Sequence, residues 1–263
     1  MRSYRGYVFD LDGTVYLGDH LIPGAKDAID AFKSRGAHVR YITNNPTKTT
    51  GEYADKLTAL GIPTAQEEVF NTVKSSVSWL VSKEPASKVY PLGEEVLSGA
   101  LREAGMEVTE NPDEIDVVLV SYDRTLTYNK LKIAFDALWR SPSARLMATN
   151  PDRYCPLPEG RGEPDAGAIV AALEVATGRR CERHFGKPNT SLLDEAVSCL
   201  DIPAKDVIFV GDRLETDIKM AVTAGIDSGL VLTGDASRED LHGIPAESHP
   251  THILKSLTEL IPS

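Results

Sequence analysis

The sequence "YVFDLDGTVYLG" spans residues 7–18 and places two aspartates at the end of an apolar run, with a glycine directly after them. The apolar run indicates a buried strand. Asp10 and Asp12 are two residues apart, so in an extended chain their side chains point to the same side. Two like charges this close repel and shift each other's pKa. A metal ion or a shared proton would offset the repulsion; the plainer alternative is a strand followed by a polar turn.

Six further β-rich runs follow along the chain, with helical patterns between most of them. Strands that alternate with helices predict an α/β fold with a parallel sheet covered on both faces. Glycines at positions 36, 61, 105, 178 and 225 are expected to end helices, because glycine tolerates the left-handed conformation that closes them. The expected strands are 7–10, 39–43, 89–92, 117–121, 146–149, 207–210 and 229–232, and the clearest helices are 25–35 and 189–200.

The middle of the 263-residue chain is expected to form an inserted domain. Polar, proline-containing stretches at 82–88 and 177–188 are typical of hinges, and the sequence between them holds about three strands and several helices, enough for a domain. We therefore predict a core built from residues 1–84 and 185–263, with an inserted domain at 85–184.

Composition and charge exclude several classes of function. The chain carries 28 Lys and Arg against 39 Asp and Glu, a net charge of −11. This balance argues against a nucleic-acid partner, which needs a basic surface, and no apolar run approaches the roughly 20 residues of a membrane span. The three cysteines form no paired pattern, and the first residues have no signal-like apolar region. We expect a cytoplasmic protein without a membrane partner; a homodimer is left open.

Polar residues lie at four predicted strand ends or helix starts. Asp10 and Asp12 follow the first strand, Thr43 ends the second in "ITNN", Lys187 precedes a helix in "FGKP", and Asp212 and Asp217 follow a late strand in "GDRLETD". Ligands of open parallel sheets bind beyond the carboxyl ends of the strands. Each stretch alone also suits an ordinary loop or a solvated charge, but together they predict one site.

This set of side chains suits a phosphate group held against Mg²⁺. Magnesium prefers oxygen ligands, usually one or two carboxylates with waters and substrate phosphate, and Asp10 and Asp212 would supply the carboxylates. Asp10 would attack phosphorus as a nucleophile, and Asp12 would protonate the leaving oxygen and later activate water. Thr43 and Lys187 would bind phosphate oxygens. The substrate would be a small phosphorylated metabolite.

The four stretches resemble the four motifs of the haloacid dehalogenase-like superfamily of phosphohydrolases. Within it the chain resembles the NagD and 4-nitrophenylphosphatase branch, subfamily IIA, because "LGEEVL", "LTYNKL" and "ATNPD" are similar to segments of the α/β cap of that branch. The resemblance implies a Rossmann-like parallel-sheet core with an inserted α/β cap of the C2 type. It also implies a Mg²⁺-dependent phosphatase that works through an aspartyl phosphate.

Carried over to this sequence, the resemblance assigns a role to each motif residue. It implies that Mg²⁺ is bound by the carboxylates of Asp10 and Asp212 and by the main-chain carbonyl of Asp12. Thr43, Asn44 and Lys187 would hold the phosphoryl group. Asp217 would order metal-bound waters or Lys187.

The inserted segment is expected to select the substrate, because the four motifs offer no contact for the rest of it. Within "ATNPDRYC", Asn150, Asp152 and Tyr154 offer hydrogen-bonding groups and one ring; a plain surface loop is the alternative. Two other functions stay open: a phosphotransferase or mutase that uses the same aspartyl phosphate, and a non-catalytic module that binds phosphorylated metabolites.

Overall fold

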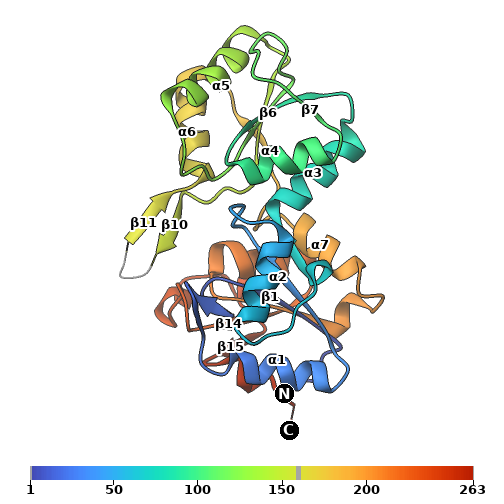
Figure 1. Cartoon of the computed structure of the whole chain (residues 1–263). Helices are drawn as coiled ribbons and strands as arrows, with labels where there is room; N and C mark the ends of the chain where they lie inside the picture. The colour runs from blue at the N-terminus through green and yellow to red at the C-terminus, as the bar shows by residue number, and fades with distance from the viewer. Residues whose placement is uncertain (1, 158–160, 263) are drawn as a thin grey trace. The chain divides into compact units, whose positions relative to one another are not determined.

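A computed structural model describes residues 2–157 and 161–262, which divide by their contacts into two compact units (Figure 1). Unit 1 comprises Met1–Thr43, Thr50–Phe70 and Lys187–Ser263. Unit 2 comprises Asn44–Thr49 and Asn71–Gly186. Each unit has its own sheet and its own apolar core.

Unit 1 contains a six-stranded sheet with β13 and β1 at its centre. The pairings of β1 with β4 and β13, of β13 with β14, and of β14 with β15 are all parallel. The register sets Asp10 opposite Ile42 of β4, so the residues that follow these strands emerge at one edge. The strand order is β15 (His252–Leu254), β14 (Asp227–Val231), β13 (Val207–Gly211), β1 (Gly6–Asp10), β4 (His38–Thr43) and β5 (Val69–Asn71).

Helices cover both faces of this sheet, as the alternating pattern predicted. The side chains of Tyr7 and Phe9 point to the face covered by α1 (Ala25–Ser34) and α2 (Thr50–Ala59), where Tyr7 stacks on Phe32 with ring centroids 3.9 Å apart. Val8 and Phe209 point to the other face, which packs against α7 (Ser191–Ser198) and α8 (Lys219–Ala224).

Shorter elements complete unit 1. After β1 the chain forms a hairpin of β2 (Tyr16–Leu17) and β3 (His20–Leu21). After β13 it forms a single π-helical turn, Leu214–Ile218, that leads into α8. Single 3₁₀ turns lie at Gln66–Glu68, Ala204–Asp206, Glu239–Leu241, Ala246–Ser248 and Leu257–Leu260.

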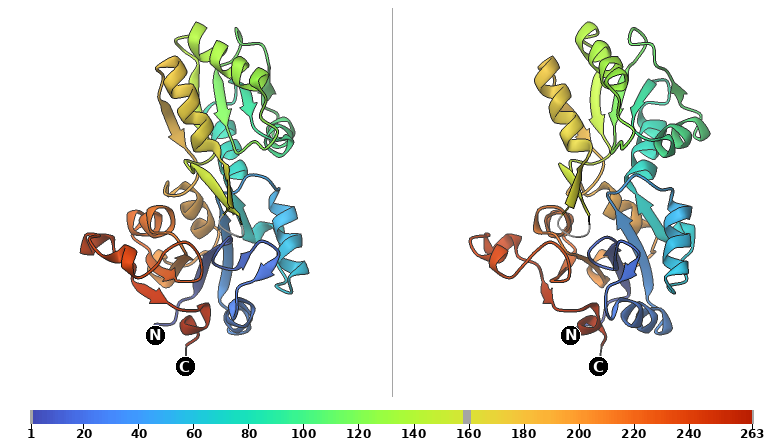
Figure 2. Two further views of the ribbon diagram at one scale, coloured as in Figure 1. Left: turned by 90° about the vertical axis from the view of Figure 1, so that its left-hand side faces the viewer. Right: turned by 60° about the vertical axis from the view of Figure 1, so that its left-hand side comes forward.

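Unit 2 has a five-stranded, all-parallel sheet. Its order is β12 (Cys181–His184), β9 (Arg145–Ala148), β8 (Val117–Val120), β6 (Lys88–Leu92) and β7 (Glu107–Val108). One face packs on α3 (Thr72–Lys83) and α4 (Glu95–Glu103), the other on α5 (Tyr128–Arg140) and α6 (Ala166–Thr177), which run side by side in Figure 2. An antiparallel hairpin of β10 (Tyr154–Leu157) and β11 (Arg161–Pro164) precedes α6.

The strands predicted from sequence are all confirmed, with ends that differ by one or two residues. The five glycines expected to end helices all have positive φ, between 68° and 91°. The sheet of unit 1 with helices on both faces confirms the Rossmann-like α/β core. Among the described residues no helix is long and apolar enough to cross a membrane.

The boundaries between the units differ from those expected at 84/85 and 184/185. The main insertion begins between Phe70 and Asn71 and ends between Gly186 and Lys187, and the short segment Asn44–Thr49 also belongs to unit 2. The physical reason is α3, which buries Val73, Val77 and Leu80 in the core of unit 2. The stretch 82–88 is therefore the end of that helix and the turn into β6, and not a hinge between the units.

Candidate active site

Three carboxylates and one lysine form a compact, buried cluster in unit 1. Asp10 ends β1, Asp212 directly follows β13, and Asp217 lies in the π-helical turn. One oxygen of each of these carboxylates lies within 4.8 Å of the others. The Lys187 Nζ lies 2.5 Å from Asp10 Oδ1 and 2.7 Å from Asp217 Oδ1. All four side chains are buried, so the cluster confirms that these three motif stretches converge at one edge of the sheet.

The charges of this cluster do not balance. Burial raises the pKa of Asp10 well above its usual value, although the Lys187 charge opposes the shift. Burial and then the Asp217 charge raise the pKa of Asp212 to about 7. The charges of Asp10 and Asp217 outweigh the opposite effect of burial and raise the pKa of Lys187. One ammonium pairs with two of the three acids, and a bound cation would favour the ionised forms of all three.

The loop after β14 holds Asp212 in place. The backbone N–H of Asp235 donates to Asp212 Oδ2 at 2.8 Å. A Cβ on Gly234 would lie 2.0 Å from that same oxygen, and a Cβ on Gly13 would lie 2.4 Å from it. Thr233 Oγ1 joins the two loops by donating to the Gly13 carbonyl at 2.9 Å. Two bare glycine backbones therefore make the space that the Asp212 carboxylate fills.

These loop residues were missed by the sequence analysis, although a signal was present. "LTGDAS" begins at the end of a predicted strand, in the same position that singled out the other motifs. This loop supports Asp212 with the backbone N–H of Asp235 and with the missing side chain of Gly234. Neither feature can be recognised from side-chain chemistry in a sequence.

Asp217 contacts both the chain at Asp212 and the Lys187 side chain. Its Oδ2 accepts hydrogen bonds from the backbone N–H groups of Asp212 and Arg213, at 3.2 and 3.1 Å. Its other oxygen pairs with Lys187. Asp217 is fully buried, so these contacts fix both the chain at Asp212 and the lysine.

Asp12 lies on the loop that joins β1 to the β2–β3 hairpin. Its carboxylate is not one of the three that form the cluster of Asp10, Asp212 and Asp217. Burial raises the pKa of Asp12, and Lys56 is the charge that most opposes this shift.

The second motif divides between the two units. Thr43 ends β4, next to the end of β1, and is buried in unit 1. The Asn44 amide donates to Asp152 Oδ2 at 2.9 Å, and the Asn44 carbonyl accepts from Asn150 Nδ2 at 2.9 Å. The structure thus gathers Asn44, Asn150 and Asp152 in unit 2, whereas Tyr154 begins β10 with 45 % of its surface exposed.

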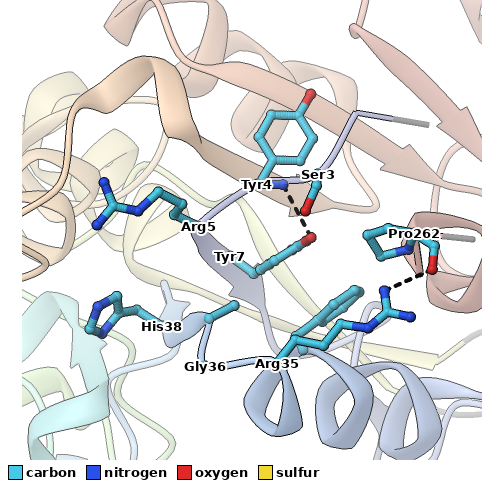
Figure 3. Close-up of a pocket in the computed structure, with 10 residues that line it drawn as sticks. Ser3, Tyr4, Arg5, Tyr7, Arg35, Gly36, His38 and Pro262 are labelled. Atoms are coloured by element: carbon cyan, nitrogen blue, oxygen red, sulfur yellow. Dashed lines mark hydrogen bonds between the residues drawn. The ribbon is translucent and has the colours of Figure 1, made fainter.

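A cavity of about 250 Å³ lies at the opposite, amino ends of β1 and β4 (Figure 3). Tyr7 lies in its middle and Arg35 at its edge, where the guanidinium donates to the Pro262 carbonyl at 2.7 Å. No carboxylate is among the described residues that line it. This cavity shares no residue with the acidic cluster, so it is not part of the candidate active site.

Family models match most of the chain in two segments. A model described as haloacid dehalogenase-like hydrolase matches residues 7–107, and a HAD-hydrolase-like model matches residues 184–260. A 5′-nucleotidase of Bacillus subtilis is 35% identical over 100% of this chain and 99% of its own length. An acid sugar phosphatase of Staphylococcus haemolyticus is 36% identical over 99% and 97%. The chain belongs to the haloacid dehalogenase-like hydrolases.

Solved structures place it in one branch of that family. A 4-nitrophenylphosphatase from Thermotoga maritima matches with a TM-score of 0.90 and 33% identity, over 98% of this chain and 96% of that one. NagD from Escherichia coli matches with a TM-score of 0.87 and 27% identity, over 98% of both chains. A glycerol phosphate phosphatase from Mycobacterium tuberculosis, solved in complex with magnesium, matches with a TM-score of 0.88 and 31% identity, over 98% of this chain and 77% of that one. The protein is therefore a NagD-like member of the haloacid dehalogenase-like hydrolases.

Proposed function

We propose that this phosphoric monoester hydrolase removes the phosphate group of small phosphorylated metabolites through a phosphoaspartate on Asp10. The observation that carries the proposal is the buried cluster of Asp10, Asp212 and Asp217 around Lys187. A buried excess of negative charge at the carboxyl end of a sheet has no structural benefit, but it is suited to a cation and a phosphate.

The residues present fit a hard divalent cation. Asp10 and Asp212 offer carboxylate oxygens within the 4.8 Å cluster, and the Gly13 and Gly234 backbones fix the Asp212 carboxylate. We assign Mg²⁺ to these two carboxylates and to the Asp12 main-chain carbonyl. When bound, Mg²⁺ would neutralise charge on the phosphate oxygens.

In the first step a carboxylate oxygen of Asp10 attacks phosphorus and the bond from phosphorus to the leaving oxygen breaks. Asp12 gives its proton to that oxygen, which departs as an alcohol. In the second step a water oxygen attacks phosphorus, Asp12 takes a proton from the water, and the bond to Asp10 breaks. Inorganic phosphate and the original Asp10 carboxylate result.

Lys187 and Thr43 support the proposal as phosphate-binding groups. Lys187 is held between Asp10 and Asp217, so its charge stays beside the nucleophile throughout both steps. Thr43 follows Ile42, the partner of Asp10 in the sheet register, so this residue lies at the same edge of the sheet as Asp10. We also assign Asn44 to this group, and its hydrogen bond to Asp152 would fix the orientation of its amide.

We assign the choice of substrate to unit 2, with the loop of Asn150 and Asp152 and the β10–β11 hairpin that carries Tyr154. The relatives support a small phosphomonoester as substrate, because their names cover a 5′-nucleotidase, an acid sugar phosphatase and a glycerol phosphate phosphatase. Catalytically active relatives of this kind argue against a non-catalytic binding module.

The test is direct detection of the phosphoenzyme. Rapid quench with ³²P-labelled substrate and Mg²⁺ should trap label on the protein in an acid-stable, base-labile form, and Asp10→Asn should trap none. Label that persists in Asp10→Asn would overturn the assignment of the nucleophile. An assay with added sugar acceptors distinguishes a hydrolase from a phosphotransferase. A phosphotransferase would produce a phosphorylated sugar in place of inorganic phosphate.

A further inference from the structure

Lys56 holds the aromatic ring of Tyr16 from the neighbouring helix. Lys56 lies on α2, and its Nζ lies 3.8 Å from the centroid of the Tyr16 ring. The ring is fully buried. A cation at this distance over an aromatic face is attracted by the quadrupole of the ring, most strongly where water is excluded. The contact joins α2 to the β2–β3 hairpin within unit 1.

The backbone of Tyr16 in turn closes the loop that carries Asp12. The Gly13 N–H donates to the Tyr16 carbonyl at 2.8 Å, and the Tyr16 N–H donates to the Leu11 carbonyl at 3.2 Å. These two bonds hold the chain on both sides of Asp12. A displacement of the Tyr16 ring would therefore move the loop at the residues next to the Asp12 carboxylate.

The contact depends on the ring of Tyr16 and not on its hydroxyl. The buried Tyr16 hydroxyl has no hydrogen-bond partner in the part of the chain that the structure describes. Lys56 also lies 3.9 Å from Asp19, but the Asp19 side chain is 95% exposed, and such pairs contribute little.

We propose that Lys56 is a positioning residue that acts through the Tyr16 ring to hold Asp12 at the leaving oxygen. The inference rests on the proposed function, in which Asp12 exchanges protons with the substrate. Lys56 lies outside the four motifs and outside the carboxylate cluster, and nothing in the sequence pattern singled it out.

The experiment compares single-turnover phosphorylation of the enzyme by p-nitrophenyl phosphate and by an alkyl phosphate. p-Nitrophenolate departs with little protonation, whereas an alkoxide needs a proton from Asp12. Lys56→Met should slow phosphorylation by the alkyl phosphate about five- to tenfold, the range expected for loss of a cation–π contact. Phosphorylation by p-nitrophenyl phosphate should change less than about twofold, and substrate KM should stay the same.

Two matched variants of lysine control for charge and fold. Lys56→Arg keeps a cation that can lie over the ring, so it should restore at least half of the lost rate. Lys26→Met makes the same change of charge at a lysine of α1 whose partner is Asp30, and it should leave both rates unchanged. Melting temperatures of all variants separate a general loss of stability from a loss of positioning.

A double-mutant cycle tests the route through the ring. Tyr16→Phe keeps the ring and removes only the unpartnered hydroxyl, so it should be nearly neutral. Tyr16→Leu should reproduce the selective loss of Lys56→Met, and the double variant should lose no more than either single one. Additive losses would mean that Lys56 acts independently of Tyr16 and would overturn the proposal.

Other outcomes also reject it. Equal losses for both substrates in Lys56→Met would remove the link to Asp12, and a raised KM with unchanged rates would make Lys56 a substrate contact. The proposed function is judged separately by Asp10→Asn and Asp12→Asn. If Asp12→Asn slows phosphorylation by p-nitrophenyl phosphate and by the alkyl phosphate equally, the proposed role of Asp12 as general acid is rejected, whatever the Lys56 variants show.

Discussion

Gly234 lies so close to Asp212 that a Cβ on the glycine would come within 2.0 Å of the carboxylate oxygen Oδ2. The same oxygen accepts the N–H of Asp235. The glycine is therefore needed for the space beside the proposed metal ligand. Gly234 is not among the glycines with positive φ, so a substitution there tests space alone.

Gly234→Ala should displace the Asp212 carboxylate and weaken Mg²⁺ binding about tenfold or more, the ratio that corresponds to about 1.4 kcal/mol. The concentration of Mg²⁺ that gives half-maximal activity measures this effect. Gly99→Ala is the matched control: it lies inside α4 with no heavy atom nearer than 3.9 Å to the added Cβ, so it should raise stability by about 0.5–1 kcal/mol and leave Mg²⁺ dependence unchanged. Equal Mg²⁺ dependence of both variants would contradict this account.

Asp10→Asn should abolish turnover while the fold persists. The amide cannot attack phosphorus, and the cluster of three acids loses one of its like charges. Without metal the variant should melt no lower than the wild-type protein, because the remaining two acids repel less. Circular dichroism and thermal melting check the fold, and a variant that retained a tenth of wild-type kcat would show that Asp10 is not the nucleophile.

Lys187→Met should destabilise the protein and remove its activity. The ammonium lies between Asp10 and Asp217, and its loss leaves buried carboxylates without their cation, at a cost of about 3–5 kcal/mol. Chemical denaturation measures the loss. The double variant Lys187→Met/Asp217→Asn should recover part of this stability but none of the activity. A double variant no more stable than Lys187→Met would indicate that lost packing, and not unpaired charge, causes the effect.

Chelation should remove activity, and Mg²⁺ should restore it. A ligand that binds only the folded state stabilises it, by about 2.7 kcal/mol at a concentration of 100 times its dissociation constant. Mg²⁺ should therefore also raise the melting temperature of the wild-type protein, but not that of Asp212→Asn. Ca²⁺ accepts more ligands in looser geometry, so it should raise the melting temperature and support little turnover. Full activity in Ca²⁺ would argue against a strict octahedral site.

Tyr154 and Asp152 should differ in their effects on specificity. Tyr154→Ala removes an exposed ring at the start of the β10–β11 hairpin, and we expect it to lower kcat/KM about tenfold for the best metabolite but not for p-nitrophenyl phosphate. Asp152→Ala should also lower kcat/KM for the best metabolite, and because it removes the carboxylate that accepts from Asn44 it should slow p-nitrophenyl phosphate as well. Identical profiles for the two variants would place neither residue in substrate selection.

The strands and the acidic cluster could be predicted from sequence because both rest on local rules. Continuous apolar runs mark strands that are buried on both faces. The carboxyl ends of parallel strands share one edge of a sheet, so polar residues that directly follow different strands converge without further information. Asp10 and Asp212 met for this reason, although 202 positions separate them along the chain. Asp217 follows Asp212 in the π-helical turn after the same strand, and Lys187 lies just before α7.

Three features depended on how distant segments pack, and local patterns carry no record of that. The amphipathic pattern of α3 shows that one face is buried but not on which sheet it packs, so the first boundary between the units was expected too late. Gly234 and Asp235 serve Asp212 through backbone space and a backbone N–H, which side-chain chemistry does not reveal. Lys56 contacts Tyr16 because α2 packs against the β2–β3 hairpin. From sequence alone, a lysine in a helix is expected to be solvent-exposed, so this contact could not be predicted.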